Sequence, residues 1–135
     1  MTKTDLLLSA VLVHLADSLS VPDGGFSVTV RDWMDARAGF AVSVVPEFEQ
    51  RLPGSVTPED IERYASRHAK VLDHPDILLG GWRNPEDRLA YLDVSVVVRN
   101  RRQALVLART HDQLAIWDFA RQVSIPVVSS GRAQS

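Results

Sequence analysis

The sequence has no cysteine, and this absence excludes disulfide bonds and thiolate catalysis. A zinc site would have to be built from histidine and carboxylate side chains alone. Net charge is also scarce: the formal charge is −2 and the isoelectric point is near 6.0, so no overall field attracts nucleic acid or an acidic membrane surface. Without disulfide bonds the fold must depend on packing. Without net positive charge, nonspecific nucleic-acid binding is disfavoured.

Lysine is almost missing as well. Only Lys3 and Lys70 are lysines among the 15 basic residues, and the other 13 are arginines. Most arginine codons are rich in G and C and lysine codons are not, so this bias indicates a GC-rich coding sequence.

A long hydrophobic run is the third thing the chain lacks. The apolar segment Leu6–Val13 is far shorter than the roughly 20 residues that a membrane helix needs. Asp5 stands where a secretory signal carries positive charge, and His14 and Asp17 interrupt the apolar pattern downstream. We therefore expect a cytoplasmic protein with no membrane association.

The apolar segment instead predicts an N-terminal helix within residues 1–20, with Thr4 as the N-cap and Asp5 in the first turn. Apolar residues occupy two sides of this helix, namely Leu7, Val11 and Leu15 on one side and Leu8, Leu12 and Leu19 on the other. Such a helix is either deeply buried or leaves one apolar stripe exposed. An exposed stripe would bind a protein partner or a second copy of the chain.

Alternating hydrophobicity predicts three β-hairpins, and helical periodicity predicts two further helices. The hairpins are Phe26–Arg31 with Phe40–Val45, Ile77–Trp82 with Leu89–Val98, and Leu114–Phe119 with Val123–Val128; the helices are Pro58–Leu72, capped by Thr57, and Arg101–Arg109, capped by Asn100. The capping residues are the clearest local signals, because each satisfies free backbone N–H groups at a helix start.

These elements give the order α-ββ-α-ββ-α-ββ. Strands joined by tight turns are antiparallel, so we predict an α+β fold with a mostly antiparallel sheet and helices packed on one face. With 135 residues, of which 45% are hydrophobic, a single domain over residues 1–135 is expected. Residues 129–135 are predicted to form a flexible polar tail.

The strand Leu89–Val98 is the most informative single element. Its alternation assigns Ala90, Leu92, Val94, Val96 and Val98 to a core face. The following helix and the strand from Leu114 are joined to it by short connections, which predicts a strand-helix-strand core.

The opposite face of that strand carries Tyr91, Asp93 and Ser95. If uncovered, it presents a phenol, an acid and a hydroxyl in one row, about 7 Å apart per step. Asp118, on a neighbouring strand, is a candidate second carboxylate for acid–base work or for a divalent cation. The alternative interpretation is a solvated face of a one-sided sheet.

The four histidines do not form a recognised metal-binding pattern. His68, His74 and Asp76 are close in sequence, but a helix end separates them and their spacing matches no ligand motif. His111 and Asp112 are adjacent at a helix end, where a turn is the common outcome. No metal and no cofactor is predicted.

Two further groups are candidate binding residues. Arg99, Arg101 and Arg102 cluster at a helix start, where an anion, an acidic partner or nucleic acid could dock; the alternative is a solvated helix end. Trp33 falls on the polar side of its predicted strand, with Ser27, Thr29 and Arg31. An exposed tryptophan there would anchor a partner.

Three motifs resemble those of a small uncharacterised α+β domain that recurs in actinobacteria and their phages. They are Gly80-Gly-Trp82, Tyr91-Leu-Asp-Val-Ser95 and Asp112-Gln-Leu-Ala-Ile-Trp-Asp118, within a similar stretch from Thr57 to Val127. The resemblance implies a GC-rich bacterial or phage gene and an accessory product. It brings no activity and no catalytic residues, because none is established for that domain.

We expect a non-enzymatic protein that binds a protein partner or itself through the N-terminal apolar helix, the exposed sheet face or a free sheet edge. The first alternative is a small enzyme or toxin-like effector that uses Asp93, Ser95 and Asp118. The second alternative is nucleic-acid contact through Arg99 and its two neighbouring arginines. Nucleic acid is the less favoured partner because the chain has no net positive charge.

Overall fold

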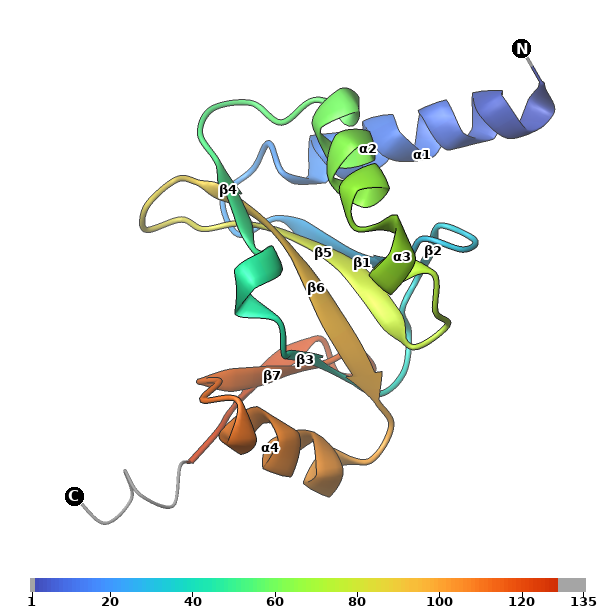
Figure 1. Ribbon diagram of the computed structural model, residues 1–135. Helices are drawn as coiled ribbons and strands as arrows, with labels where there is room; N and C mark the ends of the chain where they lie inside the picture. Colours follow the sequence, from blue (N-terminus) through green and yellow to red (C-terminus); the bar gives the residue numbers. More distant parts are fainter. Residues whose placement is uncertain (1, 129–135) are drawn as a thin grey trace.

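The computed structural model describes residues 2–128, so the predicted tail at 129–135 lies outside the described residues. Four α-helices, a short 3₁₀ helix and eight strands form within that range (Figure 1). In chain order they are α1 (Lys3–Ser18), β1 (Gly25–Thr29), β2 (Met34–Asp35), β3 (Phe40–Ser43), η1 (Pro46–Phe48), β4 (Gln50–Leu52), α2 (Pro58–Arg67), α3 (Ala69–Leu72), β5 (Ile77–Arg83), β6 (Ala90–Val98), α4 (Arg101–Thr110), β7 (Ala115–Asp118) and β8 (Val123–Pro126).

The strands form one curled antiparallel sheet in the order β2-β1-β5-β6-β3-β7-β8. The long strand β6 organises this sheet. It pairs with β5 along one side, and on its other side it pairs first with β4 and then with β3. The predicted α+β class and antiparallel sheet are confirmed.

The side chains that alternate along β6 separate a helix-bearing face from an uncovered one. Two core clusters lie on the helix-bearing face. The first joins α1, α2 and α3 to β1, β5 and β6 and includes Leu15, Tyr64 and Leu92; the second joins α4 to β3, β7 and β8 and includes Val42 and Ile116. Helices therefore pack on one face of the sheet, as predicted.

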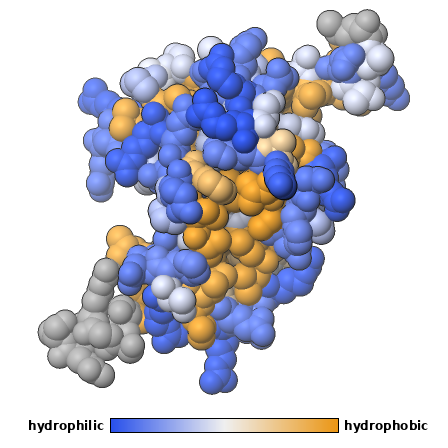
Figure 2. Space-filling view, viewed as in Figure 1, coloured by the Kyte–Doolittle hydropathy of each residue, from blue (hydrophilic) through white to orange (hydrophobic). Residues whose placement is uncertain are grey.

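A hydrophobic band lies between these two groups of helices (Figure 2). Half-buried apolar side chains flank both clusters, including Val71 and Ile77 beside the first and Val44, Val98 and Leu107 beside the second. The helices thus cover the sheet at its two ends more completely than between them.

Two of the three predicted hairpins form. β5 pairs with β6 and β7 pairs with β8. The hairpin predicted between Phe26–Arg31 and Phe40–Val45 is wrong, because β1 pairs with the two-residue β2 and with β5, while β3 lies between β6 and β7. The strand-helix-strand unit of β6, α4 and β7 consequently crosses over β3, and the short strands β2 and β4 were not predicted.

The helix ends differ from the predictions in two places. The N-cap of α1 is Thr2 and not Thr4, because Thr2 and Asp5 form a reciprocal capping box. Thr57 caps α2 as predicted, but the predicted helix Pro58–Leu72 is divided at His68 into α2 and α3. No helix in residues 2–128 is long and apolar enough to cross a membrane.

The connection between β3 and β4 is held by a buried tyrosine. Tyr64 on α2 donates a hydrogen bond from its hydroxyl to the carbonyl oxygen of Phe48, at 2.6 Å, and burial raises the pKa of this phenol. On this edge of β6, Asp93 and Val94 pair with neither β3 nor β4. The contact fixes η1 beside that unpaired stretch.

Gly81 allows an aromatic ring to lie flat on the sheet. A Cβ atom added at Gly81 would collide with the ring of Phe26, its cross-strand neighbour on the helix-bearing face. We expect Gly81→Ala to lower the free energy of unfolding by about 1–3 kcal/mol through overpacking, measured by urea denaturation. In a Phe26→Ala background the ring is absent, so the same methyl group should cost much less; equal costs would contradict this packing.

Candidate functional site

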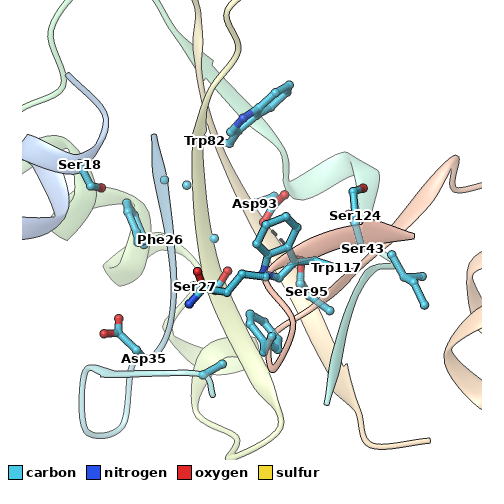
Figure 3. A pocket seen from close by; sticks show the side chains of 18 of the residues that line it. Ser18, Phe26, Ser27, Asp35, Ser43, Trp82, Asp93, Ser95, Trp117 and Ser124 are labelled. Carbon is cyan, nitrogen blue, oxygen red and sulfur yellow. Dashed lines mark hydrogen bonds between the residues drawn. The ribbon is translucent and has the colours of Figure 1, made fainter. Parts of the chain in front are cut away.

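The uncovered face of the curled sheet encloses a cleft of about 1060 Å³. Strands β1, β5, β6, β3, β7 and β8 all contribute residues to it. The C-terminal half of α1 borders it at His14 and at Ser18, the latter labelled in Figure 3. Serine and tryptophan side chains recur along its walls, and Asp93 projects into it (Figure 3). This cleft is the candidate functional site.

Tyr91, Asp93 and Ser95 share the uncovered face, as the alternation predicted. The register of β6 with β5 places Trp82 opposite Tyr91 and Gly80 opposite Asp93. Of the three predicted residues, Asp93 and Ser95 line the cleft. Tyr91 lies beside the cleft and forms an aromatic pair with Trp82; the two ring centroids are 5.8 Å apart.

Gly80 makes room for the carboxylate. A Cβ atom added at Gly80 would collide with Oδ1 of Asp93, so the Asp93 side chain lies across the neighbouring strand where only a glycine backbone is present. The hydroxyl of Ser95 donates a long hydrogen bond to the same oxygen, at 3.4 Å. Asp93 is therefore held at the floor of the cleft and is only partly accessible to solvent.

Burial shifts the ionisation of Asp93. It raises the pKa of the carboxyl from its ordinary value of 3.8 to about 6, and the negative charge of Glu49 raises it further, while the hydrogen bond from Ser95 opposes the shift. The carboxylate thus carries its charge at neutral pH in surroundings that disfavour that charge.

Two tryptophans that the sequence did not single out as site residues form walls of the cleft. Trp82 is 41% exposed, and its indole N–H donates to Asp23 at 2.7 Å. Trp117 on β7 is 40% exposed and lies opposite Ala41 of β3. Alternation along each strand could have predicted that both tryptophans face the cleft. Trp82 alternates with Gly81 and Leu79, which face the helices, and Trp117 alternates with the buried Ile116.

A ladder of side chains continues outward from Trp82. Tyr91 follows it on β6, and Arg51 of β4 lies with its guanidinium 5.0 Å from the centre of the Tyr91 ring. Arg51 also forms an ion pair with Glu49 at 3.1 Å, and the Tyr91 hydroxyl donates to Asp87. This ladder is an internal contact that already satisfies the charge of Arg51.

Asp118 does not join Asp93. It lies on the helix-bearing side of β7, where it is buried and where its Oδ1 accepts hydrogen bonds from the backbone N–H groups of Ala120 and Arg121, at 3.1 and 3.2 Å. Its carboxylate therefore stabilises the turn between β7 and β8. The acid–base pair that the sequence suggested is not assembled.

The other predicted binding residues lie outside the cleft. Trp33 is not on a strand: it occupies the turn between β1 and β2 with a positive φ of 55°, and its half-buried ring packs against the first core cluster. Arg99, Arg101 and Arg102 are exposed at the start of α4, as predicted, and Arg99 pairs with Asp76 at 3.8 Å. None of these four residues lines the cleft.

Histidine and carboxylate side chains are not grouped for a metal ion. Among residues 2–128 no three such groups are placed where they could hold one. His68 instead packs against Tyr64 in a tilted arrangement, with ring centroids 4.5 Å apart, and burial lowers the pKa of its imidazole.

Comparisons with known proteins give no assignment: no protein-family model, no curated protein and no solved structure matches this chain. The resemblance to an actinobacterial and phage domain therefore stays a prediction.

The ionisation of Asp93 has a measurable effect on stability. Because folding raises its pKa, the folded state binds a proton more tightly than the unfolded state, and the wild type loses stability relative to a neutral variant as the pH rises from about 4 to about 6. We expect Asp93→Asn to be more stable than the wild type by on the order of 2 kcal/mol at neutral pH. The difference should vanish below about pH 4 in urea denaturation, and a difference independent of pH would contradict the shift.

Proposed function

We propose that this protein is a non-enzymatic binding module that holds an extended segment of a protein partner in the cleft on the uncovered face of its sheet. The observation that carries the proposal is the cleft itself: about 1060 Å³ of space lined by two half-exposed tryptophans, at a sheet face that a helix reaches only at one border, where the C-terminal half of α1 lies. Sheet faces left open in this way need a reason, since exposed large aromatic side chains are characteristic of binding surfaces.

The size and composition of the cleft favour a peptide segment. Its volume of about 1060 Å³ lies just above the range of about 300–1,000 Å³ that is usual for small-molecule pockets. Serines from four strands, Ser27, Ser43, Ser95 and Ser124, offer hydroxyl groups along its length (Figure 3). Hydroxyl groups beside rigid aromatic walls suit the mixed polar and apolar surface of a polypeptide.

The chemistry of the site favours binding over catalysis. Of the three residues that the enzyme alternative requires, Asp93 and Ser95 line the cleft, whereas Asp118 stabilises a turn on the other face. Ser95 donates its hydrogen bond to a carboxylate at 3.4 Å, which is not the hydroxyl–base–orienting group arrangement of a nucleophilic site.

A bulky side chain placed in the cleft should block binding. Peptides are first selected from a random phage-displayed library on the immobilised wild type. We expect the Ser43→Trp variant to retain these peptides at least about tenfold less well than the wild type; tenfold corresponds to roughly 1.4 kcal/mol. Ser66→Trp on the exposed side of α2 is the matched control. Equal retention by both variants would place the binding surface elsewhere, and a library that yields no binder would overturn the proposal.

A second candidate function is self-association through α1. The first half of this helix extends beyond the sheet (Figure 1) and exposes Leu6 and Leu7, each at 57%. In the second half Val13 is 48% exposed. The buried residues of α1, Leu12, Leu15 and Ala16, all lie in the second half. An apolar helix face left in water is stabilised by contact with another apolar surface, and a second copy supplies one.

The oligomeric state tests this candidate directly. If α1 mediates self-association, light scattering after size exclusion should give about twice the chain mass of 15.0 kDa. The double variant Leu6→Lys, Leu7→Lys should then give the mass of one chain, whereas Val106→Lys, at an exposed apolar site on α4, should not change the mass. A wild type of single-chain mass at high concentration removes the candidate.

A further inference from the structure

Asp93 has no cationic partner among the residues that the structure describes. Within residues 2–128 the ion pairs engage Asp73, Glu49, Asp60 and Asp76, and the side chain of Asp93 receives a hydrogen bond only from Ser95. A carboxylate at the floor of a cleft gains most from a charged partner because little water reaches it. A positively charged group on a bound molecule would supply such a partner.

The charges around the cleft do not supply that partner. Three carboxylates line the cleft, those of Asp23, Asp35 and Asp93. Its basic or titratable nitrogen groups are fewer, namely Arg37 and His14. Glu49 lies close enough to Asp93 to raise its pKa, and Arg51, which follows on β4, is already paired with Glu49. The surroundings of Asp93 are therefore acidic.

Aromatic side chains complete the geometry. Trp82 and Trp117 both line the cleft and both keep about two-fifths of their surface exposed. Figure 3 shows the two tryptophans on different strands, with the Asp93 side chain between them. A tryptophan ring attracts a cation through its negative face, and this attraction adds to that of a carboxylate in the same space.

Granting the proposed function, we propose that Asp93, Trp82 and Trp117 form a subsite for a cationic side chain, the ammonium group of a lysine or the guanidinium of an arginine, on the bound segment of the partner protein. Gly80 has a defined role in this subsite, because its lack of a side chain leaves room for the carboxylate to lie across the strand at the floor of the cleft. The acidic surroundings would reject a segment with an acidic residue at the same position.

The test uses the full chain and a random peptide library displayed on phage. Peptides retained by the wild type should be enriched in lysine and arginine over the starting library by at least about fivefold at one position. The enrichment should disappear on Asp93→Asn, a neutral variant of the same shape. Asp73→Asn, at an exposed carboxylate paired with Arg31, is the matched control and should leave it unchanged.

Charge reversal gives a second reading of the same subsite. Asp93→Lys, checked for a native circular dichroism spectrum, should retain peptides enriched in aspartate and glutamate. If that variant does not fold, the comparison of Asp93→Asn with Asp73→Asn decides alone.

Two outcomes overturn this inference and leave the proposed function in place. Peptides that bind and are blocked by Ser43→Trp, but show no basic preference, would overturn the cationic subsite and leave the binding cleft standing. A basic preference that persists in Asp93→Asn would also overturn the subsite. If no peptide is retained at all, both fail together.

Discussion

The structure depends on one strand, β6, which serves as the pairing partner of three others. β5 follows it along its length, and β4 and β3 share its opposite edge in succession. A nine-residue strand with apolar side chains at every second position has only one way to bury them. Once Leu92 and Val94 face the helices, Asp93 and Ser95 must face away from them.

The cleft is a consequence of this arrangement and of the curl of the sheet. Because all helices pack on one face, the other is left to whatever the alternate residues present. The curl brings β7 and β8 into the same concave surface as β1 and β5, although they are separated along the sheet by β6 and β3. Residues distant in sequence, such as Ser27 and Ser124, therefore line one space.

Local signals in the sequence were sufficient for the elements that form locally. The hairpins β5–β6 and β7–β8 and the start of α2 at Thr57 depend on neighbouring residues, and each was predictable from alternation or capping. The place of β3 was not, since its pairing with β6 and β7 joins residues more than fifty positions apart. No local pattern carries that information.

The candidate site shows the same division. Asp93 and Ser95 followed from alternation within one strand. The position of Asp118 required knowing which face of β7 turns toward α4, and a shift of one residue separates it from Trp117, which does line the cleft. Trp33 was misplaced because β1 already ends at Thr29 and Trp33 lies in the following turn with a positive φ, a conformation that a bulky aromatic residue does not predict.

The two tryptophan walls differ in how firmly they are held. Trp82 is tied to the loop after α1 through Asp23, and its ring packs beside Tyr91. In residues 2–128 the Trp117 indole N–H has no hydrogen-bond partner, and its strand pairs with β3 through only two residues. The Trp82 ring is thus held by a hydrogen bond as well as by packing, whereas the Trp117 ring is positioned by its strand alone. A substitution at Asp23 would therefore disturb one wall of the cleft and leave the other in place.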